Sequence, residues 1–322
     1  MTRRRLAIVA LLALALASNA AAEGWPDRPI KMVLSQPAGS GPDTVARLLG
    51  DQLARSLGQP VVIDNKPGGQ NIIGATAAAH APADGYTFYL GTLAALITNV
   101  YLFKELSYDP RKDFAPVGMI GIVPFALVVP AASPIGSLDD FIARAKAEPG
   151  KIALANEGPK TFGGMMARLL NHRAGLETNL VAFSSAATAV NDTVAGHTDA
   201  VLSDVPSTAA LVASGRLRPV AVTSATRVPT LPDVPALAER LPGFAYVGWL
   251  AMVAPSGTPA ESVQRFNRAL DAALREPEIA QRLRTIGPVT EGAGSPEALA
   301  AFLTDEHTRW AALTQAIGLL PE

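Results

Sequence analysis

The sequence predicts an α/β fold with largely parallel sheets, divided into two domains. Strand-like apolar segments alternate with amphipathic helical segments along the chain, which is the pattern of α/β architecture. A mature chain of about 300 residues exceeds what one hydrophobic core usually serves, so two domains are expected. The tetrapeptide ARLL occurs at 46–49 and again at 167–170, each time after a strand and a loop. We interpret this echo as a repeated unit; the alternative is chance recurrence in a chain rich in alanine and leucine.

Seven short segments rich in β-branched and aromatic residues are predicted as strands, and helices fill the gaps between them. The strands are 30–35, 61–65, 86–91, 125–130, 151–156, 199–204 and 218–224.

Two of the predicted helices have recognisable ends. The helix from Asp43 to Gly58 carries apolar residues at helical spacing and ends on a glycine suited to a left-handed cap. Ser137 and Asp140 give a capping-box-like start to a helix that runs to Ala147, before a proline-glycine pair.

Two further helices near the C-terminus open on Pro259 and Pro296, since proline is favoured in the first turn. The apolar residues of each helix fall on one face, so we expect packing and not chemistry. These residues are Val263, Phe266, Leu270 and Leu274 in the first helix, and Leu299, Leu303, Trp310, Leu313 and Ile317 in the second.

Residues 1–22 have the pattern of a cleavable signal peptide. Three arginines at 3–5 precede an unbroken apolar segment, 6–17, and small residues follow up to Ala22. The apolar segment is shorter than the roughly 20 residues that cross a bilayer, and it lacks the polar face of a retained amphipathic anchor. We therefore expect cleavage near Ala22 and export to the periplasm or the medium.

The composition argues against several classes of protein. The chain has no cysteine, which removes disulfides, thiolate metal sites and thiol nucleophiles. A net charge of -1, without a basic cluster beyond the leader, argues against nucleic-acid binding and electrostatic membrane docking. The four histidines are scattered, and no G-x-S-x-G elbow occurs. We therefore expect no catalytic site, no metal and no cofactor.

The loop in MVLSQPAGSGPDTVARLL is the most informative motif. It is a poor dinucleotide site, because Thr44 stands where a third glycine is needed and Asp43, as N-cap, would place negative charge where phosphate must lie. Small residues can instead expose amide N–H groups to one carboxylate, with Asp43 holding the loop by capping the helix. An ordinary turn with a satisfied cap is the alternative. The small residues are Ala38, Gly39, Ser40 and Gly41.

Other strand ends offer further candidates, because α/β folds bind ligands at the carboxyl ends of their strands. In the second unit, Thr161 is a cap or a ligand donor and Phe162 an apolar wall, while Glu157 with Lys160 could equally be a solvated pair. The remaining candidates are Asn156 in the same loop, Ser203 and Asp204 after the strand 199–204, and Thr92 and Leu93 after the strand 86–91.

The chain resembles the Bug, or TctC-like, solute-binding proteins of tripartite tricarboxylate transporters over nearly all of its mature length. The segments that carry the resemblance, in family order, are WPDRPIKMVL, ARLLGDQLARSLGQPVVIDNKPGG, PADGYTFYLGT, LSYDPRKDFAPV, LRPVAVTS, RVPTLPDVPALAE, GFAYVGWLAMVAPSGTP and the closing helix with Trp310. The resemblance implies a two-domain type II periplasmic binding protein fold with the ligand in the interdomain cleft.

The same resemblance implies a periplasmic solute-binding protein that captures a small organic carboxylate and delivers it to transporter membrane subunits. It implies no catalysis, and we expect a monomer. In the family, the first strand-to-helix loop typically holds one carboxylate, partly through water, and Asp43 matches the family aspartate after that loop. A periplasmic enzyme or a ligand sensor on the same fold is the alternative.

Departures from the family pattern shape the expected ligand. We expect one carboxylate and a remainder less polar than citrate or aspartate, unless Lys160 serves a second acidic group. In the first loop Gln36 replaces an aromatic residue, Ala38 a proline and Ser40 a glycine. After the strand 86–91, Leu93 follows Thr92 where small polar residues are usual. In the second domain Glu157, Pro159 and Lys160 replace a Ser, Gly and Asn pattern, and Ser203 stands where aspartate is common.

The chain is expected to cross between the domains near Val123, before an apolar strand, and again near Val247. Domain 1 would then comprise 23–122 and 247–322, and domain 2 would comprise 123–246. Both ends of the mature chain would belong to domain 1.

Overall fold

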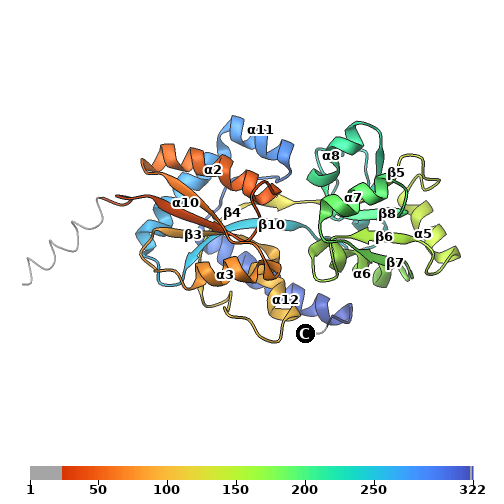
Figure 1. The fold of residues 1–322 in the computed structure, drawn as a ribbon, viewed down its shortest axis with the longest axis horizontal. Coiled ribbons are helices and arrows are strands. Elements are labelled where there is room, and N and C mark those ends of the chain that lie inside the picture. Colours follow the sequence, from red (N-terminus) through yellow and green to blue (C-terminus); the bar gives the residue numbers. More distant parts are fainter. Residues whose placement is uncertain (1–23, 320, 322) are drawn as a thin grey trace, which may run out of the picture.

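Two five-stranded sheets, each covered by helices, form two lobes that lie side by side (Figure 1). The computed structural model describes residues 24–319 and 321, so the predicted signal peptide lies outside the described residues. Within the described part of the chain, every helix is too short or too polar to cross a membrane. The architecture confirms the predicted α/β fold with two sheets.

Lobe 1 is built on the sheet of order β2-β1-β3-β10-β4. Its strands are β1 (Ile30–Leu34), β2 (Val61–Asn65), β3 (Thr87–Thr92), β4 (Phe114–Val123) and β10 (Gly248–Pro255). Its helices are α2 (Gly41–Leu57), η1 (Gly69–Asn71), α3 (Ile72–Ala79), η2 (Ala94–Thr98), α4 (Asn99–Leu102), α10 (Ala260–Arg275), α11 (Pro277–Ile286) and α12 (Pro296–Ala316).

Lobe 2 is built on the sheet of order β7-β6-β8-β5-β9. Its strands are β5 (Phe125–Pro130), β6 (Ala153–Asn156), β7 (Asn179–Ala182), β8 (Ala200–Asp204) and β9 (Leu217–Val222). Its helices are α5 (Leu138–Ala147), α6 (Phe162–Ala174), α7 (Ala186–Val194), α8 (Val205–Ala213) and α9 (Leu237–Arg240).

The two sheets repeat one arrangement. In each, three parallel strands, β2-β1-β3 or β7-β6-β8, are followed by an antiparallel strand, β10 or β5. The helix that follows the central parallel strand is α2 in lobe 1 and α6 in lobe 2. The two ARLL segments therefore lie in equivalent helices, as the repeated-unit interpretation predicted.

All seven predicted strands are present, and three strands were missed. β4 contains a proline and two glycines, which are poor strand residues, and β7 has only four residues at the edge of its sheet. β10 is buried along its whole length, and periodicity alone cannot identify a continuous apolar run as a strand.

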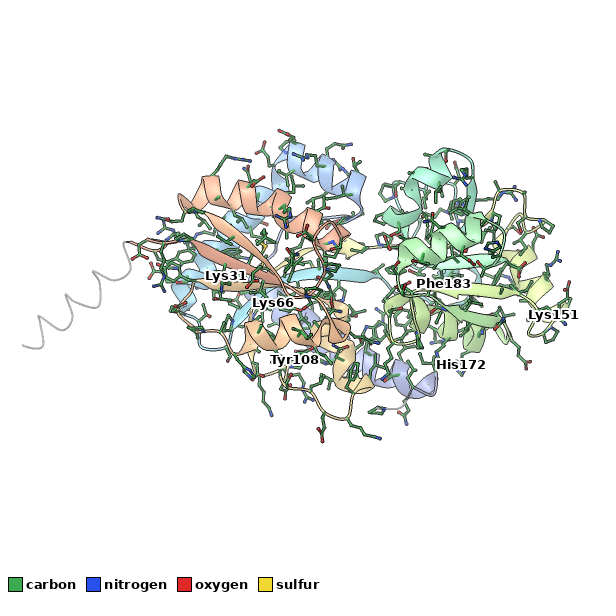
Figure 2. All side chains as sticks on the ribbon, viewed as in Figure 1. Lys31, Lys66, Tyr108, Lys151, His172 and Phe183 are labelled. Carbon is green, nitrogen blue, oxygen red and sulfur yellow. The ribbon has the colours of Figure 1, made fainter. Side chains whose placement is uncertain are left out.

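The carboxyl ends of the parallel strands in each sheet lie beside the segments that join the lobes. Thr92, at the end of β3, pairs with Leu250, near the start of β10, and Asp204, at the end of β8, pairs with Phe125, the first residue of β5. In Figure 2, Lys66, which follows β2, lies nearer to lobe 2 than Lys31 at the start of β1. The loops after these strands therefore lie on the facing edges of the two lobes.

The joining segments also bear on the predicted domain boundaries. β4 of lobe 1 ends at Val123, and the chain returns to that sheet at Gly248. This membership supports the proposed division into 23–122 with 247–322 and 123–246, which stays a prediction.

Helix α12 starts in lobe 1 and continues beneath lobe 2 (Figure 1). Its buried Glu306 accepts hydrogen bonds from the indole Nε1 of Trp249 at 2.9 Å and of Trp310 at 3.2 Å. Trp310 in turn packs against Tyr246, with 5.9 Å between ring centroids, and Phe162, at 6.0 Å. Since Phe162 starts α6, α12 fastens lobe 2 to lobe 1.

Replacing Glu306 with alanine is expected to lower the free energy of unfolding by about 2–4 kcal/mol, because two buried indole N–H groups lose their acceptor. Urea denaturation measures this change. Asp305→Ala, at the neighbouring exposed position of α12, is the matched control and should cost under about 0.5 kcal/mol. Equal destabilisation by the two variants would contradict the role of Glu306.

Candidate functional site

The first strand-to-helix loop begins α2 differently from the predicted way. Ser40 is the N-cap: its backbone is extended, and its hydroxyl accepts a hydrogen bond from the Asp43 amide at 3.3 Å. The prediction that Asp43 caps the helix is therefore wrong. Helical geometry begins at Gly41, so Asp43 already belongs to the first turn, and a short serine hydroxyl can satisfy the cap.

Asp43 nevertheless holds the loop. Its carboxylate is 2 % exposed and accepts hydrogen bonds from the Gly39 amide at 2.8 Å, Arg47 Nε at 2.9 Å and Asn65 Nδ2 at 2.9 Å. Burial by itself would raise the pKa of Asp43, but these three donors outweigh it and lower that pKa. The side chain therefore stays ionised and fixes the position of the loop through its hydrogen bond with the Gly39 amide.

Two of the four predicted amide donors remain available. The Gly39 amide is bound to Asp43, and the Ser40 amide donates to the Pro37 carbonyl at 3.2 Å. Within the described residues, the amides of Ala38 and Gly41 have no hydrogen-bond partner, and both residues are exposed. A carboxylate requires only two such donors, so the loop can still bind one.

Gln70 and Asn71, which lie behind the loop, were missed from the sequence, whereas Gln36 was a predicted site residue. Gln36 donates through Nε2 to Asn71 Oδ1 at 2.7 Å, while its buried Oε1 has no partner among the described residues. Asn71, with φ 76°, and its neighbour Gln70, with φ 51°, are the only non-glycine residues of the described chain with positive φ. Such strain often marks functional sites. The glycine pair in KPGGQN was the available signal.

In lobe 2, two predicted residues organise the loop between β6 and α6. Asn156 is buried at the end of β6, and its Oδ1 accepts from the Gly158 amide at 2.9 Å. Thr161 is the N-cap of α6: its hydroxyl accepts from the Gly164 amide at 3.2 Å and donates to the Gly158 carbonyl at 2.7 Å. Both side chains are therefore occupied by the loop itself.

The predicted apolar and strand-end residues differ in how accessible they are. Phe162 is half-buried and packs against Phe125, with 4.5 Å between ring centroids, at the junction of the lobes. The hydroxyl of Thr92 accepts from a backbone amide of η2 at 3.4 Å. Leu93 is 4 % exposed and belongs to the hydrophobic core.

Three predicted polar residues lie close together at the ends of β6 and β8. Ala155 of β6 pairs with Val201 of β8. The residues two positions further along, Glu157 and Ser203, therefore lie at the same level at the ends of these neighbouring strands. Ser203 is fully buried, and its Oγ has no partner among the described residues. Asp204 caps α8 and accepts from the backbone of this helix at 2.9 Å.

Glu157 has a perturbed carboxyl group. Its Oε1 accepts from the Gly163 amide at 3.1 Å, whereas the buried Oε2 has no partner within the described chain. Burial raises the pKa of Glu157 to about 7, the negative charge of Asp204 adds to this effect, and the few backbone hydrogen bonds oppose it. The structure brings the predicted residues to the facing edges, and their role in binding stays a prediction.

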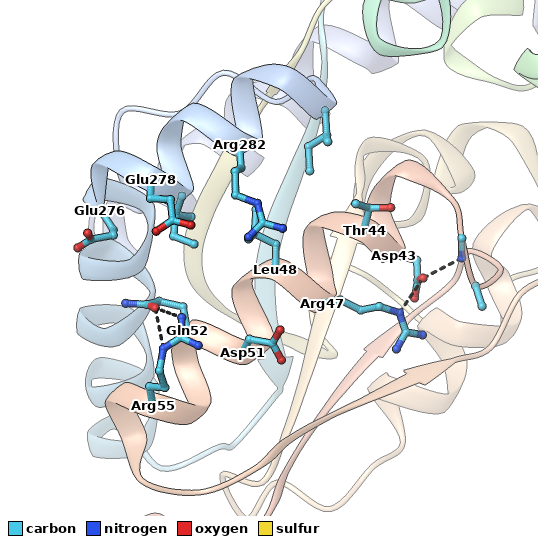
Figure 3. A pocket seen from close by; sticks show the side chains of 14 residues that line it. Asp43, Thr44, Arg47, Leu48, Asp51, Gln52, Arg55, Glu276, Glu278 and Arg282 are labelled. Atoms are coloured by element: carbon cyan, nitrogen blue, oxygen red, sulfur yellow. Dashed lines mark hydrogen bonds and ion pairs between the residues drawn. The ribbon is translucent and has the colours of Figure 1, made fainter.

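A groove with a volume of about 800 Å³ lies elsewhere, between α2 and α11 of lobe 1. Figure 3 shows Arg282 of α11 reaching toward Leu48 of α2 across it. Ala38, Gly39 and Asp43 line one end, but no residue of lobe 2 contributes, so it is not the predicted interdomain cleft. No cluster of three metal-ligating side chains occurs in the part of the chain that the structure describes.

Asp43→Ala is expected to lower the free energy of unfolding by about 2–4 kcal/mol, because three donors lose a buried acceptor. Chemical denaturation provides the measurement. Asp51→Ala, at an exposed position on the same helix, should change stability by less than about 0.5 kcal/mol. A stable Asp43→Ala protein would show that the carboxylate does not hold the loop.

Glu157 predicts a pH-dependent stability. The folded protein keeps the proton up to about pH 7, whereas an unfolded glutamate releases it near 4.5. The stabilising contribution is therefore complete below the unfolded pKa and is lost as the pH rises through the folded pKa, by at most about 3 kcal/mol. In urea titrations between pH 5 and 8, the free energy of unfolding of Glu157→Gln should rise relative to that of the wild type as the pH increases. Glu177→Gln, at an exposed position in the same lobe, should show the same pH dependence of stability as the wild type. A Glu157→Gln curve parallel to wild type would contradict a raised pKa.

Comparison with known proteins identifies the family. The family model described as "Tripartite tricarboxylate transporter family receptor" matches residues 45–319. Protein BugT of Bordetella pertussis (strain Tohama I) is 33% identical over 305 residues, which cover 94% of this chain and 93% of BugT.

Two solved structures from Rhodopseudomonas palustris are similar over almost their whole length. Rpa4515 with adipate has a TM-score of 0.85 and 33% identity, covering 92% of this chain and 100% of that chain. MatC (Rpa3494) with bound malate has a TM-score of 0.78 and 30% identity, covering 90% of this chain and 99% of MatC. The family consists of solute-binding receptors, which confirms the expectation that the chain is not an enzyme. The chain belongs to the receptor family of tripartite tricarboxylate transporters, the Bug or TctC-like solute-binding proteins.

Proposed function

We propose that this protein captures a small organic carboxylate between its two lobes, in the periplasm, and delivers it to the membrane subunits of a tripartite tricarboxylate-type transporter. One observation carries the proposal: the amides of Ala38 and Gly41 are unpaired in a loop that Asp43 anchors on the edge facing lobe 2. A carboxylate at this position would receive two charge-assisted hydrogen bonds.

The charge of Asp43 does not prevent an anion from binding nearby. Its carboxylate is paired with Arg47 Nε at 2.9 Å and also accepts from Asn65. This pairing compensates the negative charge, while the first turn of α2 adds the positive end of the helix dipole. The loop can therefore hold a ligand carboxylate without losing its own anchor.

Contacts between the lobes support binding between them. The Lys160 ammonium of lobe 2 lies 4.4 Å from the centroid of the Phe103 ring of lobe 1. On the α11 side, Gly287 approaches Pro206 so closely that a Cβ there would lie 1.8 Å from the proline ring. A ligand that touches both facing edges would add its own contacts to these.

The relatives support the ligand class and the partner. Rpa4515 was solved with adipate and MatC with malate, and both ligands are carboxylates. The family description supports partnership with transporter membrane subunits. The structural relative BugD is named a periplasmic binding protein, which supports the periplasmic location.

A thermal-shift screen of mono-, di- and tricarboxylates, followed by calorimetry, tests the proposal. A bound acid should raise the melting temperature, since it binds the folded state preferentially; at 100 times its Kd the stabilisation is about 2.7 kcal/mol. Amines and neutral sugars of similar size are the controls. A panel in which no acid shifts the transition would contradict the proposed function.

Gly41→Pro should weaken acid binding about tenfold or more, because it removes one N–H donor to a charged acceptor. Proline suits the first helical position, so the helix should persist. Gly41→Ala is the matched control: it keeps the amide, and its Cβ has no atom within 4 Å. Equal affinities of the two variants, measured by calorimetry, would show that this amide does not bind the ligand.

A further inference from the structure

The start of α6 in lobe 2 is already filled by a side chain of the protein. α6 follows β6 as α2 follows β1, so its first turn is the counterpart of the proposed carboxylate loop. The Gly163 amide donates to Glu157 Oε1 at 3.1 Å, and the Gly164 amide donates to Thr161 Oγ1. The amides of Gly163 and Gly164 are therefore already used within the protein.

Of the two glycines at this helix start, Gly163 makes room for Glu157 and Gly164 for the backbone of the loop. A Cβ on Gly163 would lie 2.4 Å from Glu157 Oε2, and a Cβ on Gly164 would lie 1.9 Å from the Gly158 carbonyl oxygen. A larger residue at either position would push the loop away from the helix. The packing thus presses the Glu157 carboxyl group onto the first turn of α6.

The acids of the two lobes are held in opposite ways. Asp43 accepts three hydrogen bonds and is paired with an arginine, whereas Glu157 accepts one bond through Oε1 and leaves the buried Oε2 without a partner in the described chain. On the neighbouring strand β8, the fully buried Ser203 Oγ also lacks a partner among the described residues. The Oε2 of Glu157 after β6 and the Oγ of Ser203 in β8 can therefore each accept a hydrogen bond from a water or a ligand group.

The charges around Glu157 disfavour a second anion. Asp204, at the end of β8, is negative and raises the pKa of Glu157, which burial already raises to about 7. Lys160 lies in the same loop, but its ammonium is placed over the Phe103 ring of lobe 1. Thr161, the N-cap of α6, acts on the same carboxyl group and is neutral; further along α6, the buried Nε of Arg168 has no partner among the described residues.

We propose that Glu157 sets the ligand class by occupying the position of a second ligand carboxylate, so that the protein selects acids with one carboxylate and a neutral far end. The inference rests on the proposed function and deepens it. A dicarboxylate would bring a second anion against Glu157, with Asp204 nearby. A neutral ligand group instead can hydrogen-bond to the free oxygen of Glu157.

Calorimetry with acids of equal chain length tests the inference. The probes are the pairs hexanoate and adipate, and butanoate and succinate, at pH 6 and pH 8. At pH 8 the wild type should bind the monocarboxylate of a pair at least about tenfold more tightly than the dicarboxylate. A tenfold difference corresponds to about 1.4 kcal/mol, which we assign to the repulsion between Glu157 and the second carboxylate. At pH 6, where Glu157 holds its proton, this preference should shrink.

Glu157→Gln removes the charge and keeps the shape, so it should reduce the preference to within about threefold and abolish its pH dependence. Glu157→Ser provides a second variant should the amide disturb the loop, and it should bind dicarboxylates more tightly than wild type. Glu177→Gln, exposed in lobe 2, is the control and should behave as wild type.

The possible failures are distinguishable. A wild type that prefers the dicarboxylates, or a preference that Glu157→Gln and Glu157→Ser leave unchanged, would overturn the inference while leaving the proposed function intact. Failure of every acid in the wider panel to bind would overturn the proposed function, and the inference with it.

Discussion

The hydrogen bond from the Gly39 amide to the buried carboxylate of Asp43 is the constraint on which the candidate site depends. It ties the loop to the first turn of α2, and the contacts of Asp43 with Arg47 and Asn65 join the helix to the neighbouring strand. A loop of small residues would otherwise sample many conformations and lose entropy on binding. The acid therefore serves as a support that leaves the neighbouring amides exposed.

The same fold unit is used twice with different electrostatic outcomes. In lobe 1 the acid has a cationic partner and stays ionised, whereas in lobe 2 the half-buried Glu157 has a buried Oε2 without a partner among the described residues, and burial raises its pKa to about 7. A repeated sheet order thus does not impose a repeated binding chemistry. The difference arises from which polar groups surround each carboxyl group, since burial without a counter-charge disfavours ionisation.

The connection between the lobes combines two strand crossings with one helix. β4 continues into β5, the chain returns at β10, and α12 packs its Trp310 against Phe162 at the start of α6. Because Glu306 binds the indoles of both Trp249 and Trp310, this contact is linked to the strand that returns to lobe 1. The site loops on both edges are therefore supported by elements that continue across the junction.

The sequence by itself determined the α/β class, the seven strands, the C-terminal end of α2, both ends of α5 and the family, because these depend on local periodicity, capping residues and segment order. It also identified the loop at 38–41. Only the tertiary structure decided that Ser40 caps α2, that two loop amides are consumed, and that Asn65 and Asn71 support the loop. It also decided that the Glu157 carboxyl group packs on the first turn of α6, whereas the sequence left open that Glu157 and Lys160 form a solvated pair. Hydrogen-bond partners and burial come from residues far apart in the chain, so no local pattern could assign them.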